Sequence, residues 1–210
     1  MAQRRERARQ QRSTETRERL VSAALEAFAD HGFAGATTRA IAERAGVALA
    51  ALPYHFETKE ALWRAAADRV FSQLVEQFQA RIRGLEGVDA PTRLRLLLSD
   101  YVLFAATHPQ LHRFMLREGA VPSPRLRWLV RAHVQPLFRY FRSLITEAQE
   151  QGIVRPGRPE HLYYAMIGAA SMPYAVAGEF RLLTGRDSDA KKLVEEHVDT
   201  VTALFFEETE

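Results

Sequence analysis

The sequence lacks several features that would assign it to common protein classes. It contains no cysteine, which excludes disulfide bonds, cysteine nucleophiles and thiolate metal ligands. No hydrophobic stretch is as long and pure as a transmembrane helix, and the polar, arginine-rich start lacks the apolar core of a signal peptide. No glycine-rich phosphate loop or recognised catalytic motif is present. We therefore expect a cytoplasmic protein that is not an enzyme, holds no cofactor or metal, and has no membrane partner.

The excess positive charge is concentrated near the start of the chain. The formal net charge is +3, and residues 1–64 hold 11 basic and 8 acidic residues, which leaves 18 of each in residues 65–210. A local basic excess of this kind is typical of a segment that binds nucleic acid. With 210 residues, of which 47% are hydrophobic and 26% charged, the chain is long enough for one or two small globular domains.

Five arginines and one glutamate occupy residues 1–12. Such a segment favours a flexible, partly disordered tail, and it equally suits an arm that follows phosphates or enters the minor groove of DNA. Both alternatives stay open, because a tail that is free in solution can bind once DNA is present. From residue 13 or 14 onward we expect a helix that ends at Gly32.

Residues 37–62 carry the clearest local pattern of the chain. Thr37 and Thr38 offer hydroxyl caps to a helix, and Gly46 supplies the left-handed residue that a tight turn after that helix needs. Val47 then falls between two crossing helices, the second of which is short. This order of elements predicts a helix-turn-helix, the commonest small unit that reads DNA.

At these residues the chain resembles the TetR family of transcriptional regulators. The family's signature combines a threonine pair, Ile-Ala, Ala-Gly-Val, an aromatic stretch and a final Ser/Thr-Lys-Glu-Ala-Leu. The positions that match it are Thr37, Thr38, Ile41, Ala42, Ala45, Gly46, Val47, Leu52, Tyr54, His55, Phe56, Thr58, Lys59, Glu60, Ala61 and Leu62. Agreement at so many positions in a short window is specific, whereas a bare helix-turn-helix pattern is common by chance.

The resemblance implies which side chains contact DNA. Thr38 and Arg39 open the supporting helix next to the DNA backbone, and Arg39 is the only long hydrogen-bonding side chain near the groove, so it is our candidate base reader. Tyr54, His55 and Lys59 match positions that lie at or near phosphates in the family. An alternative for Tyr54 and His55 is that their rings only pack between helices.

The expected recognition helix departs from the family pattern. Ala48, Ala50, Ala51 and Pro53 stand where the family often has serine, glycine-threonine and a phosphate-binding tyrosine. Leu49, Ala50 and Ala51 can meet thymine methyl groups, so specificity must come largely from Arg39, the N-terminal arm and DNA shape. Because Pro53 removes an amide and restricts the residue before it, we expect this helix to be short, kinked or partly 3₁₀.

The remaining pattern is helical throughout, which predicts an all-α fold of about nine helices. We assign residues 1–62 to a helix-turn-helix domain with a basic arm, and residues 63–210 to a domain that binds an effector and dimerises. Pro136 and Pro173 should kink the helices that contain them. The helices expected after the helix-turn-helix cover residues 58–83, 91–107, 109–119, 123–152, 160–184 and 187–208.

A regulator needs an input, and aromatic and methionine side chains of the second domain suit an apolar or aromatic small molecule. The candidate pocket residues are Phe104, His112, Met115, Trp128, Phe138, Tyr163, Met166, Met172 and Tyr174. Each of them also suits a plain core position. His108 and His112 have a spacing that can hold a metal, but no third ligand is evident, and a capping role for His108 is the simpler interpretation.

The resemblance further implies a homodimer formed by the last two helices. Paired recognition helices about 34 Å apart would read two half-sites of a palindromic operator in double-stranded DNA. We therefore predict a dimeric, nucleoid-associated regulator, most simply a repressor that a small effector releases. Two other hypotheses remain: a salt-sensitive protein that coats DNA without sequence preference, and a helical carrier of a small ligand. The carrier leaves residues 37–62 unexplained.

Overall fold

The computed structural model describes residues 1–207, and these residues fold into helices, which confirms the all-α prediction. An isolated antiparallel bridge joins Val154 and Phe206. The chain divides into two compact units. Unit 1 comprises Met1–Val70 with Arg113–Val121, and unit 2 comprises Phe71–His112 with the chain from Pro122 onward. The functional boundary that we place after residue 62 stays a prediction.

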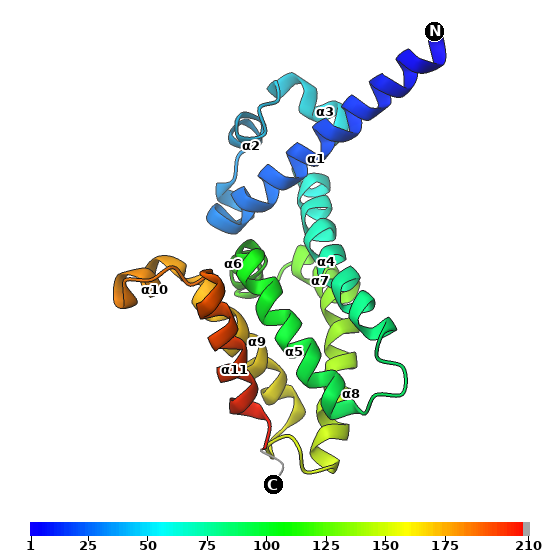
Figure 1. Ribbon diagram of the computed structural model, residues 1–210. Coiled ribbons are helices and arrows are strands. Elements are labelled where there is room, and N and C mark those ends of the chain that lie inside the picture. The colour runs from blue at the N-terminus through cyan, green and yellow to red at the C-terminus, as the bar shows by residue number, and fades with distance from the viewer. Residues whose placement is uncertain (208–210) are drawn as a thin grey trace. The chain divides into compact units, whose positions relative to one another are not determined.

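Unit 1 contains the helix-turn-helix region, drawn from blue to cyan in Figure 1. Its helices are α1 (Ala2–Gly35), α2 (Thr38–Arg44), η1 (Leu49–Ala51), α3 (Leu52–His55), the first half of α4 (Lys59–Arg83) and most of α6 (Pro109–Gly119). The fully buried side chains that form its core include Leu20, Phe28, Ile41, Leu62 and Trp63. Trp63 stacks on Phe114 with ring centroids 5.3 Å apart, so α6 completes this core.

Unit 2 is a helical bundle arranged around α5 (Ala90–Thr107), which packs against α8, α9 and α11 (Figure 1). The other helices are α7 (Pro124–Leu129), η2 (Val130–Val134), α8 (Gln135–Glu150), α9 (Pro159–Ala175), α10 (Ala177–Thr184) and α11 (Lys191–Phe205). In unit 2 the exposed Arg81 of α4 donates two hydrogen bonds of 2.6 Å to the carboxylate of the buried Asp100. Both contacts raise the pKa of Arg81.

The helices of unit 2 differ from the expected ones in where they begin and end. The helix predicted over residues 160–184 is two helices, because Val176 has non-helical angles (φ −113°, ψ 38°) shortly after Pro173. The last helix begins at Lys191 rather than at residue 187, since a turn bonds the Ala190 N–H to the Asp187 carbonyl. It ends at Phe205, and its predicted end at residue 208 lies outside the described residues. Within residues 1–207, no helix combines the length and the apolar character needed to cross a bilayer.

Candidate nucleic-acid interface

The supporting helix α2 begins as its sequence predicts. The Thr37 hydroxyl accepts a hydrogen bond from the Ala40 N–H at 3.1 Å, which satisfies one of the free donors of the first turn. Ile41 is fully buried and anchors the helix to the unit 1 core. Thr38 is half-buried beside it, and Arg39 is exposed. The first turn of α2 therefore presents a guanidinium group to solvent on a fixed backbone.

A left-handed glycine makes the turn between α2 and the recognition segment. Gly46 has φ +62°, a backbone conformation that residues other than glycine rarely adopt. The Val47 N–H then donates to the Ala42 carbonyl at 2.9 Å, which closes the end of α2. The turn predicted from sequence is confirmed at the residue expected.

The recognition segment is a 3₁₀ turn, Leu49–Ala51, followed by one α-helical turn, Leu52–His55. This confirms the short, partly 3₁₀ helix predicted from Pro53, whose missing N–H suits a first helical turn. Leu52 is buried and fixes the segment to the core, as does Phe56 after it. The segment is therefore anchored through Leu52 and the following Phe56, while Leu49, Ala50, Pro53 and Tyr54 face outward.

The outward face of this segment is largely apolar. Tyr54 is 90% exposed and Leu49 47% exposed, and Ala50 and Pro53 are exposed as well. Ala51 and His55 are half-buried. The alternative in which the Tyr54 ring packs between helices is therefore wrong, because the ring stands in solvent. For the half-buried His55, contact with DNA and packing between helices both stay open.

Lys59 lies at the start of α4, where Thr58 caps the helix by accepting from the Ala61 N–H at 3.0 Å. Its ammonium nitrogen lies 4.7 Å from the centroid of the Phe33 ring. This cation–π contact holds a positive charge at a helix N-terminus that would otherwise attract negative charge. The sequence motif marks Lys59 as a functional position, but nothing in the sequence indicates that Phe33 on α1 is its partner.

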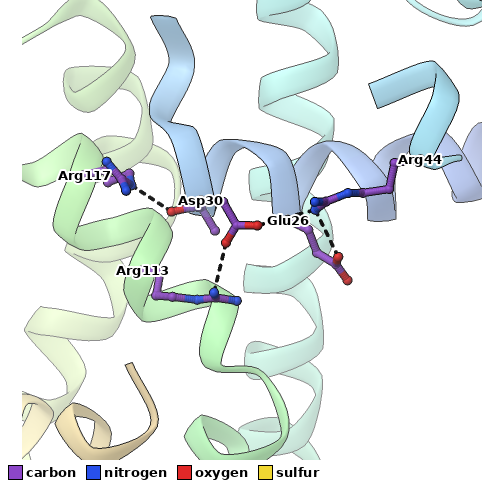
Figure 2. Close-up of polar contacts among 6 residues, drawn as sticks. Glu26, Asp30, Arg44, Arg113 and Arg117 are labelled. Carbon is purple, nitrogen blue, oxygen red and sulfur yellow. Dashed lines mark hydrogen bonds and ion pairs between the residues drawn. The ribbon is translucent and has the colours of Figure 1, made fainter. Parts of the chain in front are cut away.

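Charged side chains join α2 and α6 to α1, as Figure 2 shows. Asp30 on α1 accepts from Arg113 of α6 at 2.9 Å and from Arg44 of α2 at 3.5 Å. Arg44 also reaches Glu26 at 3.3 Å, and Arg117 donates to the Ala29 carbonyl at 2.9 Å. Asp30 thus bridges the supporting helix to a segment more than 80 residues away. Arg113 and Arg117 could not be identified from the sequence, since no local pattern marks a contact of such separation.

The N-terminal arm is helical. Helix α1 begins at Ala2, so the expectation of a flexible tail before residue 13 is wrong for this structure. After Met1 the segment consists of arginine, glutamine, alanine and one glutamate, which all have good helix propensity, and this outweighs its lack of large apolar residues. Its arginines are exposed. Further along α1, the guanidinium of Arg17 lies 5.0 Å from the centroid of the Phe56 ring.

Comparison with known proteins identifies this arrangement. The family model described as bacterial regulatory proteins, tetR family, matches residues 20–73. The HTH-type transcriptional regulator RutR of Escherichia coli K12 is 28% identical over 193 residues, which is 90% of this chain and 87% of that protein.

Residues 20–73 belong to the TetR family of bacterial regulatory proteins.

Solved structures agree with this TetR-family assignment at the level of the fold. AibR, crystallised with isovaleryl coenzyme A and operator DNA, has a TM-score of 0.70 at 20% identity over 89% of this chain and 98% of that one. The ketosteroid transcriptional regulator KstR2 of Mycobacterium tuberculosis also has a TM-score of 0.70, at 16% identity over 91% and 95%. These two likenesses concern the fold of the chain.

The predicted pocket residues of this TetR-family protein are mostly core residues. Phe104, His112, Tyr163, Met166 and Tyr174 are buried. Met172 is 51% exposed, Met115 belongs to unit 1, and Trp128 and Phe138 are half-buried. Burial raises the pKa of Tyr163 to about 12 and that of Tyr174 to about 12. Tyr174 lines a cavity of about 290 Å³ together with Ala106 and Arg181. The role of all nine residues in a pocket stays a prediction.

His108, which follows the last residue of α5, and His112 of α6 lie in different surroundings. His108 stacks on Phe104 with ring centroids 4.1 Å apart, and its Nδ1 lies 2.9 Å from the Thr107 hydroxyl. His112 is buried beside the Tyr101 ring, and burial lowers its pKa to about 4. Across the described part of the chain, no group of three or more His, Cys, Asp or Glu residues is arranged to hold a metal ion.

Proposed function

We propose that this TetR-family regulator is a repressor that binds a palindromic operator as a homodimer and leaves it when a small apolar or aromatic effector binds. The observation that carries the proposal is the outward-facing segment of unit 1, which Leu52 and Phe56 anchor to the core while Tyr54 and Leu49 face solvent. Such a protein acts in the cytoplasm at the nucleoid. AibR, a structural neighbour, was crystallised with both an acyl coenzyme A and operator DNA, which supports joint control by DNA and ligand.

Each DNA-contacting residue has a distinct role in this proposal. Arg39 reads a base through its fork of N–H donors, which match guanine O6 and N7. Tyr54, Thr38, His55 and Lys59 contact phosphates and fix the register. Apolar contacts to thymine methyls come from the exposed surface of Leu49, Ala50, Ala51 and Pro53.

Exposed apolar side chains on α9 and α11 support the homodimer. Tyr164 on α9 is 70% exposed and Leu204 on α11 is 54% exposed. The two helices already pack together within one subunit, where His197 Nε2 lies 2.9 Å from the Ala169 carbonyl oxygen. Gly168 on α9 has no neighbour that an added Cβ would meet within 4 Å, so a second backbone can approach there. A second copy of this chain would cover these side chains and position two recognition segments on one face of DNA.

The test is selection of binding sites from duplexes that flank the protein's own gene, at near-physiological salt. The expected result is a palindromic site that one dimer binds. Arg39→Ala should cost about 1–3 kcal/mol and relax selectivity at one position of each half-site. Tyr54→Ala should weaken binding to all sequences alike, because a phosphate contact carries no sequence information. Arg186→Ala is the matched control, since it removes an exposed arginine of unit 2.

A second candidate function is binding to DNA without sequence preference. The apolar outward face of the recognition segment favours it, because Leu49, Ala50 and Pro53 offer no hydrogen bonds to base edges. In that case affinity would fall steeply with salt on every sequence, and Arg39→Ala would weaken all sequences equally. A selected palindrome that outcompetes random duplex by a factor of about a thousand or more would exclude it.

A further inference from the structure

We infer that a groove in unit 2 binds an organic cation with an apolar or aromatic body. The groove has a volume of about 550 Å³ and lies between α4, η2 and α8. This volume is within the range of small-molecule sites. The inference deepens the proposed function, on which it rests, because it names the chemical class of the effector and the place where it binds. None of the nine pocket residues expected from sequence lines this groove.

One wall of the groove is apolar. On the α4 side, the lining residue Phe78 is buried and Ile82 is half-buried. A ligand that covers these side chains removes their remaining apolar surface from water, which favours binding. The apolar wall therefore selects for a hydrocarbon or aromatic body.

A π-helical turn forms part of the opposite wall. The Gln135 N–H donates to the Val130 carbonyl five residues earlier, and Pro136 follows directly. Because Pro136 has no N–H, it cannot donate to a carbonyl of the preceding turn. Ala132 and Pro136 both line the groove. Single π turns of this kind within a helix often lie at functional sites.

The polar lining of the groove suits a donor with positive charge. Glu76 lines it, whereas no lysine or arginine is among its lining residues. The hydroxyl oxygen of Tyr140 is buried and has no hydrogen-bond partner within the described residues. A buried polar atom without a partner destabilises the fold, so a ligand N–H that reaches this oxygen gains a hydrogen bond and removes that cost. A carboxylate ligand would instead meet the charge of Glu76 with no cation to offset it.

Trp128 lies close enough to the groove for its fluorescence to report ligand binding. His133 lines it, stacks on Phe71 with ring centroids 4.8 Å apart, and touches Trp128 edge-on at 5.4 Å. A ligand that displaces the His133 ring changes the surroundings of the indole of Trp128. Intrinsic tryptophan fluorescence should therefore change on binding, and Trp128→Phe should abolish that change without abolishing the heat of binding.

The test is calorimetric titration of the full chain with three ligands that share one body: phenylbutylamine, phenylbutanol and phenylbutyrate. At pH 7 their head groups are cationic, neutral and anionic. The amine should bind about fivefold more tightly than the alcohol, as expected for a partly exposed charge contact, and the carboxylate least. Glu76→Gln should reduce the preference for the amine over the carboxylate to about twofold or less. Glu86→Gln, an exposed glutamate in the loop after α4, is the matched control and should change nothing.

The variant Tyr140→Phe tests whether the Tyr140 hydroxyl binds the ligand, because it removes that hydroxyl without disturbing the fold. It should weaken amine and alcohol binding by about fivefold while leaving the unfolding temperature unchanged or higher, because the variant removes a hydroxyl that has no partner. Tighter binding of the carboxylate, or amine binding that neither variant alters, would overturn the inference. If no ligand of the series binds to a preparation that still binds DNA, the groove inference fails and the DNA-binding function stands. If the amine binds as expected without weakening DNA binding, the groove stands and release by an effector fails.

Discussion

The Asp30 carboxylate lies 2.9 Å from a guanidinium nitrogen of Arg113, although 83 positions separate the two residues in the chain. Both belong to unit 1, and Asp30 simultaneously reaches Arg44 on the supporting helix (Figure 2). One carboxylate thus links the helix that carries the candidate base reader to a segment that follows α5. Any change in the placement of residues 113–121 acts directly on the surroundings of α2.

The first prediction concerns the strength of this bridge. Asp30→Asn keeps the shape of the side chain and removes its charge, so unit 1 should lose about 1 kcal/mol of stability in urea unfolding. A double-mutant cycle with Arg113→Ala should give a coupling of about 0.5 kcal/mol, since both side chains are partly exposed. The same cycle on the exposed pair Lys191 and Glu195 serves as a control and should give less. A coupling near zero for Asp30 and Arg113 would mean that solvent screens the bridge completely.

The second prediction concerns the turn glycine. Gly46→Ala forces a side chain into φ +62°, so it should destabilise the protein by about 1–2 kcal/mol and weaken DNA binding in parallel. Space is not the cause, because an added Cβ would lie 3.7 Å from the nearest atom, on the Arg19 side chain. Gly178→Ala is the control: this glycine is helical with no atom near its Cβ position, and alanine there should stabilise by about 0.5–1 kcal/mol. Thermal unfolding of the two variants in one buffer checks both signs.

The helix caps and turns of unit 1 could be predicted because they depend on residues close together in sequence. Thr37, Gly46 and Thr58 act on backbone groups within a few positions, so their types alone define the geometry. Pro136 and Pro173 marked irregular helix turns correctly. The presence of a proline does not determine whether a helix kinks, forms a π turn or breaks, since that outcome depends on what packs against the helix.

Contacts and cavities could not be predicted in the same way. The Asp30–Arg113 bridge joins segments that only the tertiary fold brings together. The pocket residues chosen for their aromatic or methionine character are largely those that fill the core, because large apolar side chains stabilise the fold most when buried. The groove in unit 2 is instead lined by partly exposed residues such as Glu76 and Leu137, whose types are ordinary for a helix surface.

The third prediction concerns acid. Burial lowers the pKa of His112 to about 4, from about 6.5 in the unfolded chain, so the folded protein binds fewer protons than the unfolded one between these values. Stability is therefore fully present above pH 6.5 and falls as the pH drops toward 4, by about 3 kcal/mol from this residue. His112→Gln should flatten this part of the curve of unfolding free energy against pH. Wild-type and variant proteins compared by urea unfolding at pH 7, 6, 5 and 4 give the difference directly. Equal slopes for the two proteins would show that His112 protonates without cost.

The fourth prediction concerns the homodimer. Leu204 is an apolar side chain of α11 that is 54% exposed in one subunit, and the proposed interface buries it against a second copy. Leu204→Glu leaves the isolated subunit intact, because the new carboxylate is hydrated there, but it places an unpaired charge inside the interface. An uncompensated interfacial charge costs about 3 kcal/mol or more, so the dimer dissociation constant should rise by about a hundredfold or more.

Sedimentation velocity across a range of concentrations measures this shift, and circular dichroism confirms that the variant is folded. Val121→Glu is the matched control, since it introduces the same charge at an exposed valine outside α9 and α11. If Leu204→Glu sediments as the wild-type protein does, α11 does not form the interface. Because two linked recognition segments bind a palindrome far more tightly than one, a variant that becomes monomeric should also lose operator binding while retaining weak, salt-sensitive binding to any duplex.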